Sequence, residues 1–227
     1  MPKTPQFSND KIGKKITGKR GIYDYEMYYL PISDEQLLEE LIQKILARRE
    51  KGTNKSCLHT TRNDIISYNT ENTIHAFGFI RDPLYPEDEA SGSIQINYDG
   101  HIYLSDLCRN YTTKRSSSTN ISPIKVLLGF FENIIKTELG RSKVRLMVLF
   151  KKNNVIQHGS FILQDIYSNY GFSVKTTKTD GTKYEYIVME KDLPTPMSKT
   201  PRSKTPRSKT LRTSSIVSKN KSRKSKR

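Results

Sequence analysis

The sequence predicts an α+β domain built on one mixed, mostly antiparallel sheet flanked by helices. Segments rich in Tyr, Ile, Val and Phe alternate with segments whose apolar residues recur every three or four positions, so both strands and amphipathic helices are expected. Two Asp-Gly pairs, at 99–100 and 180–181, are typical of tight turns between antiparallel strands. A helix-like run separates the strand candidates at 101–109 and 143–150, and parallel neighbouring strands require such a crossover.

The first half of the chain predicts a strand, a long helix and then three strands. "GIYDYEMYYL" (21–30) has the composition of a strand. In "SDEQ", Ser33 is the expected helix cap and Gln36 the residue that completes a capping box, and Gly52 ends the helix. The segment 58–70 predicts a second, short helix. The next expected strands are 73–81, 91–99 and 101–109, and the first helix has Leu37, Leu38, Leu41, Ile42 and Ile45 at helical spacing.

The second half predicts two helices, a buried strand and a closing hairpin. Ser122 as a cap, Pro123 at the first helical position and Gly140 at the end delimit a helix over 123–139. The strand 143–150 follows, and then a helix that carries Tyr167. The segments "FSVKTTKT" and "KYEYIVMEK" form the hairpin. The apolar face of the first of these helices consists of Ile124, Leu127, Leu128, Phe131, Ile134 and Ile135.

Composition divides the chain into a basic leader (1–20), one domain (21–193) and a basic tail (194–227). The leader and the tail are expected to be disordered, because they contain few apolar residues. The two cysteines, Cys57 and Cys108, stand in no zinc or disulfide pattern, and no metal is expected. The sequence shows neither a signal peptide nor an apolar run long enough to span a bilayer. We therefore expect an intracellular protein, cytoplasmic or nuclear, without a membrane partner.

The tail 194–227 repeats the unit P-R-S-K-T and carries twelve of the sixteen net positive charges, which leaves +4 for the rest of the chain. Clustered Lys and Arg neutralise phosphates, so the tail predicts weak, non-specific binding of nucleic acid. Such clusters are also typical of nuclear-localisation signals. A solubilising tail without any partner is the simpler alternative, and phosphorylation of its Ser and Thr residues would oppose nucleic-acid binding.

In order, the segments "DLCRNYTTKRSSSTNISPIKVLLGFFENII", "VRLMVLF", "ILQDIYSNYGF" and "YEYIVMEKDL" resemble the GNAT-type N-acetyltransferase family. In that family a strand and a phosphate-binding loop lead into a long helix, a buried strand, a helix that ends in L-Y-x-x-x-G-F, and a final hairpin. The resemblance covers roughly residues 21–193. It implies a GNAT-like (acyl-CoA N-acyltransferase) fold, acetyl-CoA as co-substrate and a primary amine of a protein or small molecule as acceptor.

The resemblance places the pyrophosphate of CoA at the loop between Asn110 and Ser122. The family pattern R/Q-x-x-G-x-G/A has no glycine counterpart here, which removes the residue that lets a backbone approach phosphate closely. Hydroxyl, backbone and charged donors remain, and a flexible polar loop without a ligand is the alternative. The two registers are Lys114-x-x-Ser117-x-Thr119 and Arg115-x-x-Ser118-x-Asn120, and Cys108 and Arg109 on the preceding strand complete the expected cofactor site.

Tyr167 stands four residues before Gly171, where the family has the tyrosine that protonates the departing CoA thiolate. The alternative is packing, since Ile162, Ile166, Tyr167 and Tyr170 would share an apolar helix face. The family's asparagine and small residue earlier on this helix correspond to Ser160 and Leu163, which do not match.

Asp106 is the candidate general base for the amine, either directly or through water, and a structural carboxylate is the alternative. His101 and His158 form no recognisable triad with Cys108, and we expect both to be structural.

Two functions from different classes follow. The first is acetyl transfer from acetyl-CoA to an amine. The second is a GNAT-like domain without catalysis that binds nucleic acid through its tail.

Overall fold

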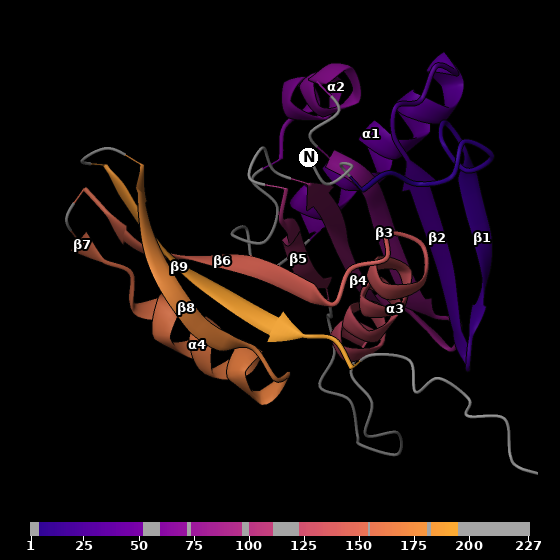
Figure 1. Ribbon diagram of the computed structural model, residues 1–227. Helices are drawn as coiled ribbons and strands as arrows, with labels where there is room; N and C mark the ends of the chain where they lie inside the picture. Colours follow the sequence, from indigo (N-terminus) through magenta and orange to yellow (C-terminus); the bar gives the residue numbers. More distant parts are fainter. Residues whose placement is uncertain are drawn as a thin grey trace, which may run out of the picture. The chain divides into compact units, whose positions relative to one another are not determined.

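The computed structural model describes residues 5–51, 60–71, 74–96, 100–110, 123–153, 155–180 and 183–194, which form a nine-stranded mixed sheet with four helices (Figure 1). The strand order is β1-β2-β3-β4-β5-β6-β9-β8, and β7 pairs with β6. The strands are β1 (Lys15–Arg20), β2 (Tyr23–Tyr29), β3 (Ile74–Asp82), β4 (Tyr85–Ile96), β5 (Ile102–Asn110), β6 (Lys143–Lys152), β7 (Val155–Ile156), β8 (Ser173–Asp180) and β9 (Tyr184–Asp192). The helices are α1 (Glu35–Lys51), α2 (Arg62–Glu71), α3 (Pro123–Thr137) and α4 (His158–Asn169).

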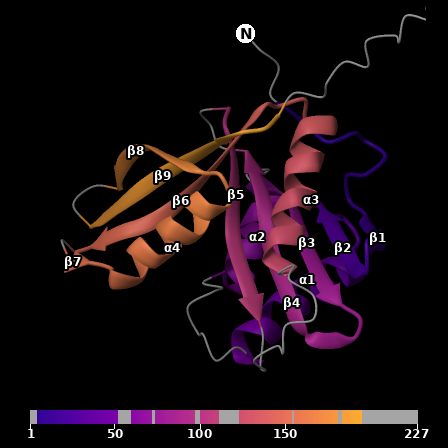
Figure 2. The same cartoon turned by 90° about the horizontal axis from the view of Figure 1, so that it is seen from below.

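The parallel pair β5–β6 lies between two antiparallel parts of this sheet. Tyr103 pairs with Arg145 and Leu104 with Leu146, and every other strand pair is antiparallel. Helix α3 connects β5 to β6 (Figure 2). The expected parallel neighbours and their crossover are therefore confirmed. This element order, with α4 and the β8–β9 hairpin following β6, is the one that the GNAT-like fold implies.

Helix α3 provides much of the main core. Its buried residues include five of the six apolar positions predicted from helical spacing, and Ile124 is half-buried. Phe131 is fully buried and lies against Gly78 of β3 and Gly92 of β4, where a Cβ atom would collide with its ring or approach it closely. Gly140 adopts a φ of 62° beyond the end of α3, a conformation that glycine adopts without strain.

A second core cluster lies against α1 and α2. Leu41, Ile42 and Ile45 of α1 pack with Phe77 and Phe79 of β3 and other buried residues. The cap of α1 differs from the expected Ser33. Asp34 Oδ1 accepts hydrogen bonds from the backbone N–H groups of Gln36 (2.9 Å) and Leu37 (3.2 Å), because a carboxylate one residue closer to the helix reaches its free donors.

The prediction of a disordered leader over residues 1–20 is wrong for residues 5–20. Phe7 is 3% exposed, and its ring lies 4.8 Å from that of Tyr29. Residues Lys15–Arg20 form β1, whose backbone pairs with β2. A strand held by ladder hydrogen bonds does not need an apolar sequence, which explains why composition failed here.

Both predicted hairpin pairings are confirmed, since β4 and β5 and also β8 and β9 are antiparallel. Residues 97–99 and 181–182 of the turns lie outside the described residues, and so does the tail from residue 195 on. The two-residue strand β7 was not predicted. Within the described ranges, no helix combines the length and apolarity of a membrane span.

Candidate functional site

Strands β5 and β6 pair at one end and separate toward the other. Within the described residues their ladder is limited to Tyr103↔Arg145 and Leu104↔Leu146, although β5 continues to Asn110 and β6 to Lys152. Each strand keeps its partner on the other side, β4 for β5 and β9 for β6. A gap therefore opens inside the sheet, between two strand edges that the ladder no longer joins.

A bulge in β5 occurs where this gap begins. The β4–β5 register steps from Ser93↔Ser105 to Ser91↔Cys108, so Asp106 and Leu107 lie opposite Gly92 alone. Asp106 has a φ of 52°, which is unusual for a residue other than glycine. A Cβ atom on Gly92 would come within 2.7 Å of the Leu107 side chain. Such bulges bend a strand and redirect its side chains and backbone groups.

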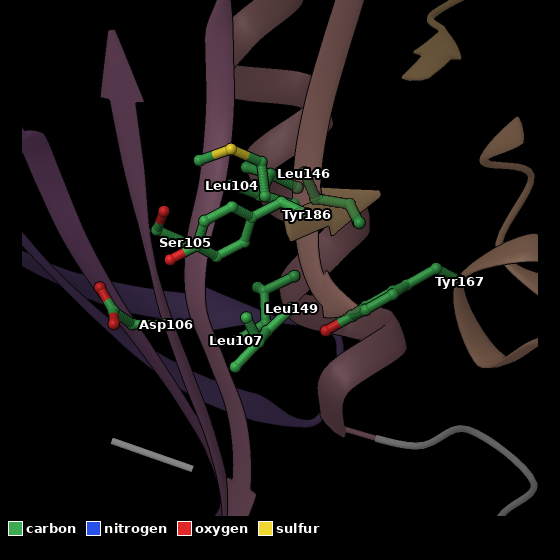
Figure 3. A pocket seen from close by; sticks show the side chains of 9 residues that line it. Leu104, Ser105, Asp106, Leu107, Leu146, Leu149, Tyr167 and Tyr186 are labelled. Atoms are coloured by element: carbon green, nitrogen blue, oxygen red, sulfur yellow. The ribbon is translucent and has the colours of Figure 1, made fainter. Parts of the chain in front are cut away.

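The gap holds a pocket of about 330 Å³. Figure 3 shows Tyr167 reaching in from α4, with its hydroxyl directed toward Leu149 and Leu107 between the two strands. Its walls combine aliphatic side chains with hydroxyl and carboxyl groups. The lining consists of Leu104, Ser105, Asp106 and Leu107 of β5, Leu146, Met147 and Leu149 of β6, Tyr167 of α4 and Tyr186 of β9.

The end of α4 fixes the position of Tyr167. The Tyr167 carbonyl accepts hydrogen bonds from the backbone N–H groups of Tyr170 (3.0 Å) and Phe172 (3.1 Å). Gly171, at a φ of 89°, turns the chain so that Phe172 can return to the core, where its ring lies 6.3 Å from that of Tyr167. The Gly-Phe pair thus ends the helix and orients the tyrosine. Tyr167 is half-buried, so it packs against the core and lines the pocket at the same time.

Asp106 lies on the other side of β5 from Tyr167 (Figure 3). Its carboxylate accepts hydrogen bonds from the hydroxyls of Thr60 (3.0 Å) and Ser93 (3.2 Å). Both hydroxyl residues are buried, at 4% and 0% exposure. Asp106 is therefore held by the segment that leads into α2 and by β4, while it still lines the pocket. The two predicted catalytic residues therefore lie on opposite sides of β5, and both line the pocket.

Of the expected cofactor residues, only Cys108 and Arg109 belong to the part of the chain that the structure describes. Lys114, Arg115, Ser117, Ser118 and Thr119 lie outside the described residues. The side chain of Cys108 is 2% exposed and does not line the pocket, and its assignment to the cofactor site stays a prediction. Arg109 pairs with Ala90 in the β4–β5 ladder. The backbone groups of Cys108 and Arg109 could still bind a cofactor.

An ion-pair cluster secures the closed end of the gap. Arg145 Nε and Lys143 Nζ of β6 donate to the Glu190 carboxylate of β9 at 2.7 and 3.1 Å. Burial alone would raise the pKa of Glu190, but these hydrogen bonds and charges lower it below its usual value. The cluster links β6 to β9 at the position where Arg145 of β6 still pairs with Tyr103 of β5. Among the described residues no group of three or more His, Cys, Asp or Glu side chains could hold a metal ion.

Several pocket residues escaped the sequence analysis, namely Leu104, Leu146, Met147, Leu149 and Tyr186. Alternation along two strands expected to be parallel neighbours would have suggested Leu104 and Leu146. Nothing local in the sequence marks Tyr186, because β9 reaches the pocket only through its pairing with β6.

Comparisons with known proteins give matches among solved structures alone: no family model and no curated protein matches the sequence. The ribosomal-protein-S18-alanine N-acetyltransferase from Escherichia coli is 12% identical, over 77% of this chain and 97% of its own, with a TM-score of 0.46. A GNAT-family acetyltransferase from Staphylococcus aureus is 16% identical over 75% and 99%, with a TM-score of 0.45. An acetyltransferase from Bacillus anthracis, solved in complex with acetyl coenzyme A, is 12% identical over 57% and 68%, with a TM-score of 0.39.

Proposed function

We propose that this chain is an N-acetyltransferase that transfers the acetyl group of acetyl-CoA to a primary amine of a protein or small molecule. One observation carries the proposal: β5 and β6 separate beyond two paired positions and enclose a pocket into which Tyr167 directs its hydroxyl. A thioester needs an extended, partly apolar slot with backbone donors near its carbonyl, and separated strand edges supply both. The pocket is lined by the carboxylate of Asp106 and by the phenol rings of Tyr167 and Tyr186, which come from three different elements.

The chemistry assigned to this pocket is direct transfer. The amine nitrogen attacks the thioester carbonyl carbon, a C–N bond forms, and the C–S bond breaks as the carbonyl re-forms. Backbone N–H groups beside the β5 bulge stabilise the developing oxyanion. The Tyr167 hydroxyl donates its proton to the departing thiolate and regains one from water. The amine loses its own proton to a carboxylate or to water.

We assign to Asp106 the role of general base for the acceptor amine. Its carboxylate lies on the opposite side of β5 from Tyr167, which supports separate approaches for the acceptor and the acyl donor. Hydroxyl donors from Thr60 and Ser93 orient it. A fixed carboxylate attracts an incoming ammonium group and accepts a proton directly or through water. For the pyrophosphate of CoA we assign Lys114, Arg115, Ser117, Ser118 and Thr119.

The second candidate function is a non-catalytic protein that binds nucleic acid through its tail. Two sequence observations favour it: the loop 110–122 contains no glycine, and residues 194–227 carry twelve positive charges without an acidic residue. In this case deletion of the tail abolishes most nucleic-acid binding and its salt dependence, since the remaining chain carries +4. Equal binding by the truncated chain at several salt concentrations contradicts it.

Calorimetric titration of the full chain with acetyl-CoA tests the first function. Leu149→Trp places a large ring in the pocket, so we expect its affinity to fall at least about tenfold, or about 1.4 kcal/mol. Leu84→Trp is the matched control, because Leu84 is 79% exposed and lies outside the pocket. Lys114→Ala with Arg115→Ala tests the assigned loop. Thermal unfolding of each variant confirms that it folds. A wild-type chain that binds no acetyl-CoA contradicts the proposal.

A further inference from the structure

Exposed apolar side chains concentrate in one part of the molecule. Of eleven exposed large hydrophobic residues in the described ranges, eight lie between Met147 and Val174. Five of them define what we call the α4–β7 surface: Val155 (62% exposed), Ile156 (42%), Phe161 (49%), Ile162 (64%) and Ile166 (40%). Single exposed hydrophobic residues are common, but a contiguous group usually marks an interaction site.

Phe150 of β6 contacts the start of α4, next to the strand end that pairs with β7. The rings of Phe161 on α4 and Phe150 on β6 lie 5.7 Å apart. The backbone N–H of Gln157 donates to the Phe150 carbonyl at 2.8 Å, which holds the start of α4 next to this strand. Ile162 and Ile166 are one helical turn apart, so they form one stripe along α4. The exposed residues of β7 and those of α4 are therefore both anchored to the same end of β6.

Lysines border the surface at its β7 end. Val155 and Ile156 pair with Lys152 and Lys151 in the β6–β7 ladder. Lys183 joins them, since its carbonyl accepts the backbone N–H of Asn153 at 2.6 Å. Lys151 forms an ion pair with Glu185 at 2.9 Å, whereas Lys152 and Lys183 are exposed. The border is thus predominantly positive.

One carboxylate lies within the apolar stripe. Asp165 is exposed on α4, directly before Ile166. Hydrocarbon offers this group no partner, and its burial in a bilayer is costly, whereas a protein partner can supply a donor. A second copy of the chain would bring an identical lysine border, and the basic tail 194–227 has the same sign of charge. Charge complementarity therefore favours an acidic protein.

We infer that the α4–β7 surface is a docking site for an acidic protein segment that carries large apolar side chains. Its apolar side chains would cover Phe161, Ile162 and Ile166, and its carboxylates would face Lys152 and Lys183. None of the five surface residues lines the pocket, so the inference goes beyond the proposed acetyl transfer and is tested without acetyl-CoA.

The test uses two fluorescent peptides and measures anisotropy with the full chain. In the first peptide, leucine occupies one helical face and glutamate the other; in the second, lysine replaces glutamate. We expect the glutamate peptide to bind more tightly. Ile162→Ser with Ile166→Ser should weaken this binding at least about tenfold, or about 1.4 kcal/mol. Ile22→Ser with Leu84→Ser is the matched control, since both residues are exposed but lie elsewhere in the fold, and it should bind as the wild type does.

Charge reversal gives a second, independent readout. Lys152→Glu with Lys183→Glu leaves the apolar stripe unchanged, and we expect it to reverse the preference toward the lysine peptide. Equal affinity of the wild type for both peptides, or no effect of either double variant, overturns the inference. Two other results also overturn it. The first is that the wild type dimerises in analytical ultracentrifugation and that Ile162→Ser with Ile166→Ser abolishes the dimer. The second is that the chain binds phosphatidylcholine–phosphatidylserine vesicles but not the glutamate peptide.

Discussion

Helices α3 and α4 both connect strands of one sheet, yet they bury their apolar residues to very different degrees. Helix α3 packs against β3, β4 and β5, and it buries Leu127, Leu128, Phe131, Ile134 and Ile135. Helix α4 packs against β6 and leaves Phe161, Ile162, Leu163 and Ile166 at least 40% exposed. Helix α3, over the middle of the sheet, therefore uses its apolar residues to form the core. Helix α4, next to β6, contributes Tyr167 to the pocket and keeps apolar side chains exposed for other contacts.

Phe131→Ala in α3 should produce the largest loss of stability. The ring is fully buried against Gly78 and Gly92, so neighbouring side chains cannot easily fill the space that it leaves. We expect the free energy of unfolding to fall by about 3–5 kcal/mol, measured by urea denaturation. Phe161→Ala in α4 is the matched variant and should cost less than about 1 kcal/mol, since half of this side chain is already exposed. Equal losses would remove the distinction between the helices.

Acid should lower the free energy of unfolding because it protonates Glu26 of β2, which forms an ion pair with Lys44 of α1. Burial alone would raise the pKa of Glu26, but hydrogen bonds and charges from Lys44 and Lys15, with the Tyr28 hydroxyl, lower it to about 2. A depressed pKa in the folded state stabilises the fold at pH values above the usual glutamate pKa of 4.5, and this stabilisation is lost as the pH falls toward 2. The charges are partly exposed, so we expect a loss of roughly 1 kcal/mol.

Denaturation curves at several pH values between 5 and 2 measure this effect. Glu26→Gln removes the titrating group, and its stability should vary less over the same range. A pH dependence identical to that of the wild type would show that other groups dominate acid unfolding.

Gly129→Ala should produce a small gain of stability within α3. A Cβ atom at Gly129 meets nothing within 4 Å, and the residue lies in the interior of a regular helix. Alanine is a better helix former, so we expect a gain of about 0.5–1 kcal/mol by the same denaturation method. Gly78→Ala is the opposing control: its Cβ atom would collide with Phe131 and approach Met27 Sδ to 2.7 Å. Destabilisation by Gly129→Ala would contradict the packing described for α3.

Sequence reasoning succeeded where local signals and the fold agree. Pro123, Gly140 and the apolar spacing between them predicted α3 and most of its buried face, because capping and periodicity act within a single helix. The Gly171-Phe172 ending likewise predicted where α4 stops and drew attention to Tyr167. The β4–β5 and β8–β9 hairpins and the parallel pair β5–β6 followed from turn and crossover signals, which are also encoded locally.

It failed where pairing between distant segments decides the structure. Strand β1 is held by the backbone of β2, and its residues carry no alternating pattern. The bulge at Asp106 depends on the register between β4 and β5. Tyr186 reaches the pocket through the pairing of β9 with β6. The pocket itself arises because two parallel strands separate, a tertiary property that no single segment specifies.

The most direct measurement of the central claim compares acetyl transfer by the wild type, Tyr167→Phe and Tyr170→Phe. Thiol release from acetyl-CoA is followed with the best acceptor from a panel of primary amines, after acetyl-CoA binding has been established for each chain. Tyr170 is the matched control, since it is half-buried on the core side of the same helix end but does not line the pocket. We expect turnover by Tyr167→Phe to fall by a factor on the order of 10², with unchanged acetyl-CoA affinity, and Tyr170→Phe to retain activity. Full activity of Tyr167→Phe would assign Tyr167 to packing alone and contradict its role as the proton donor.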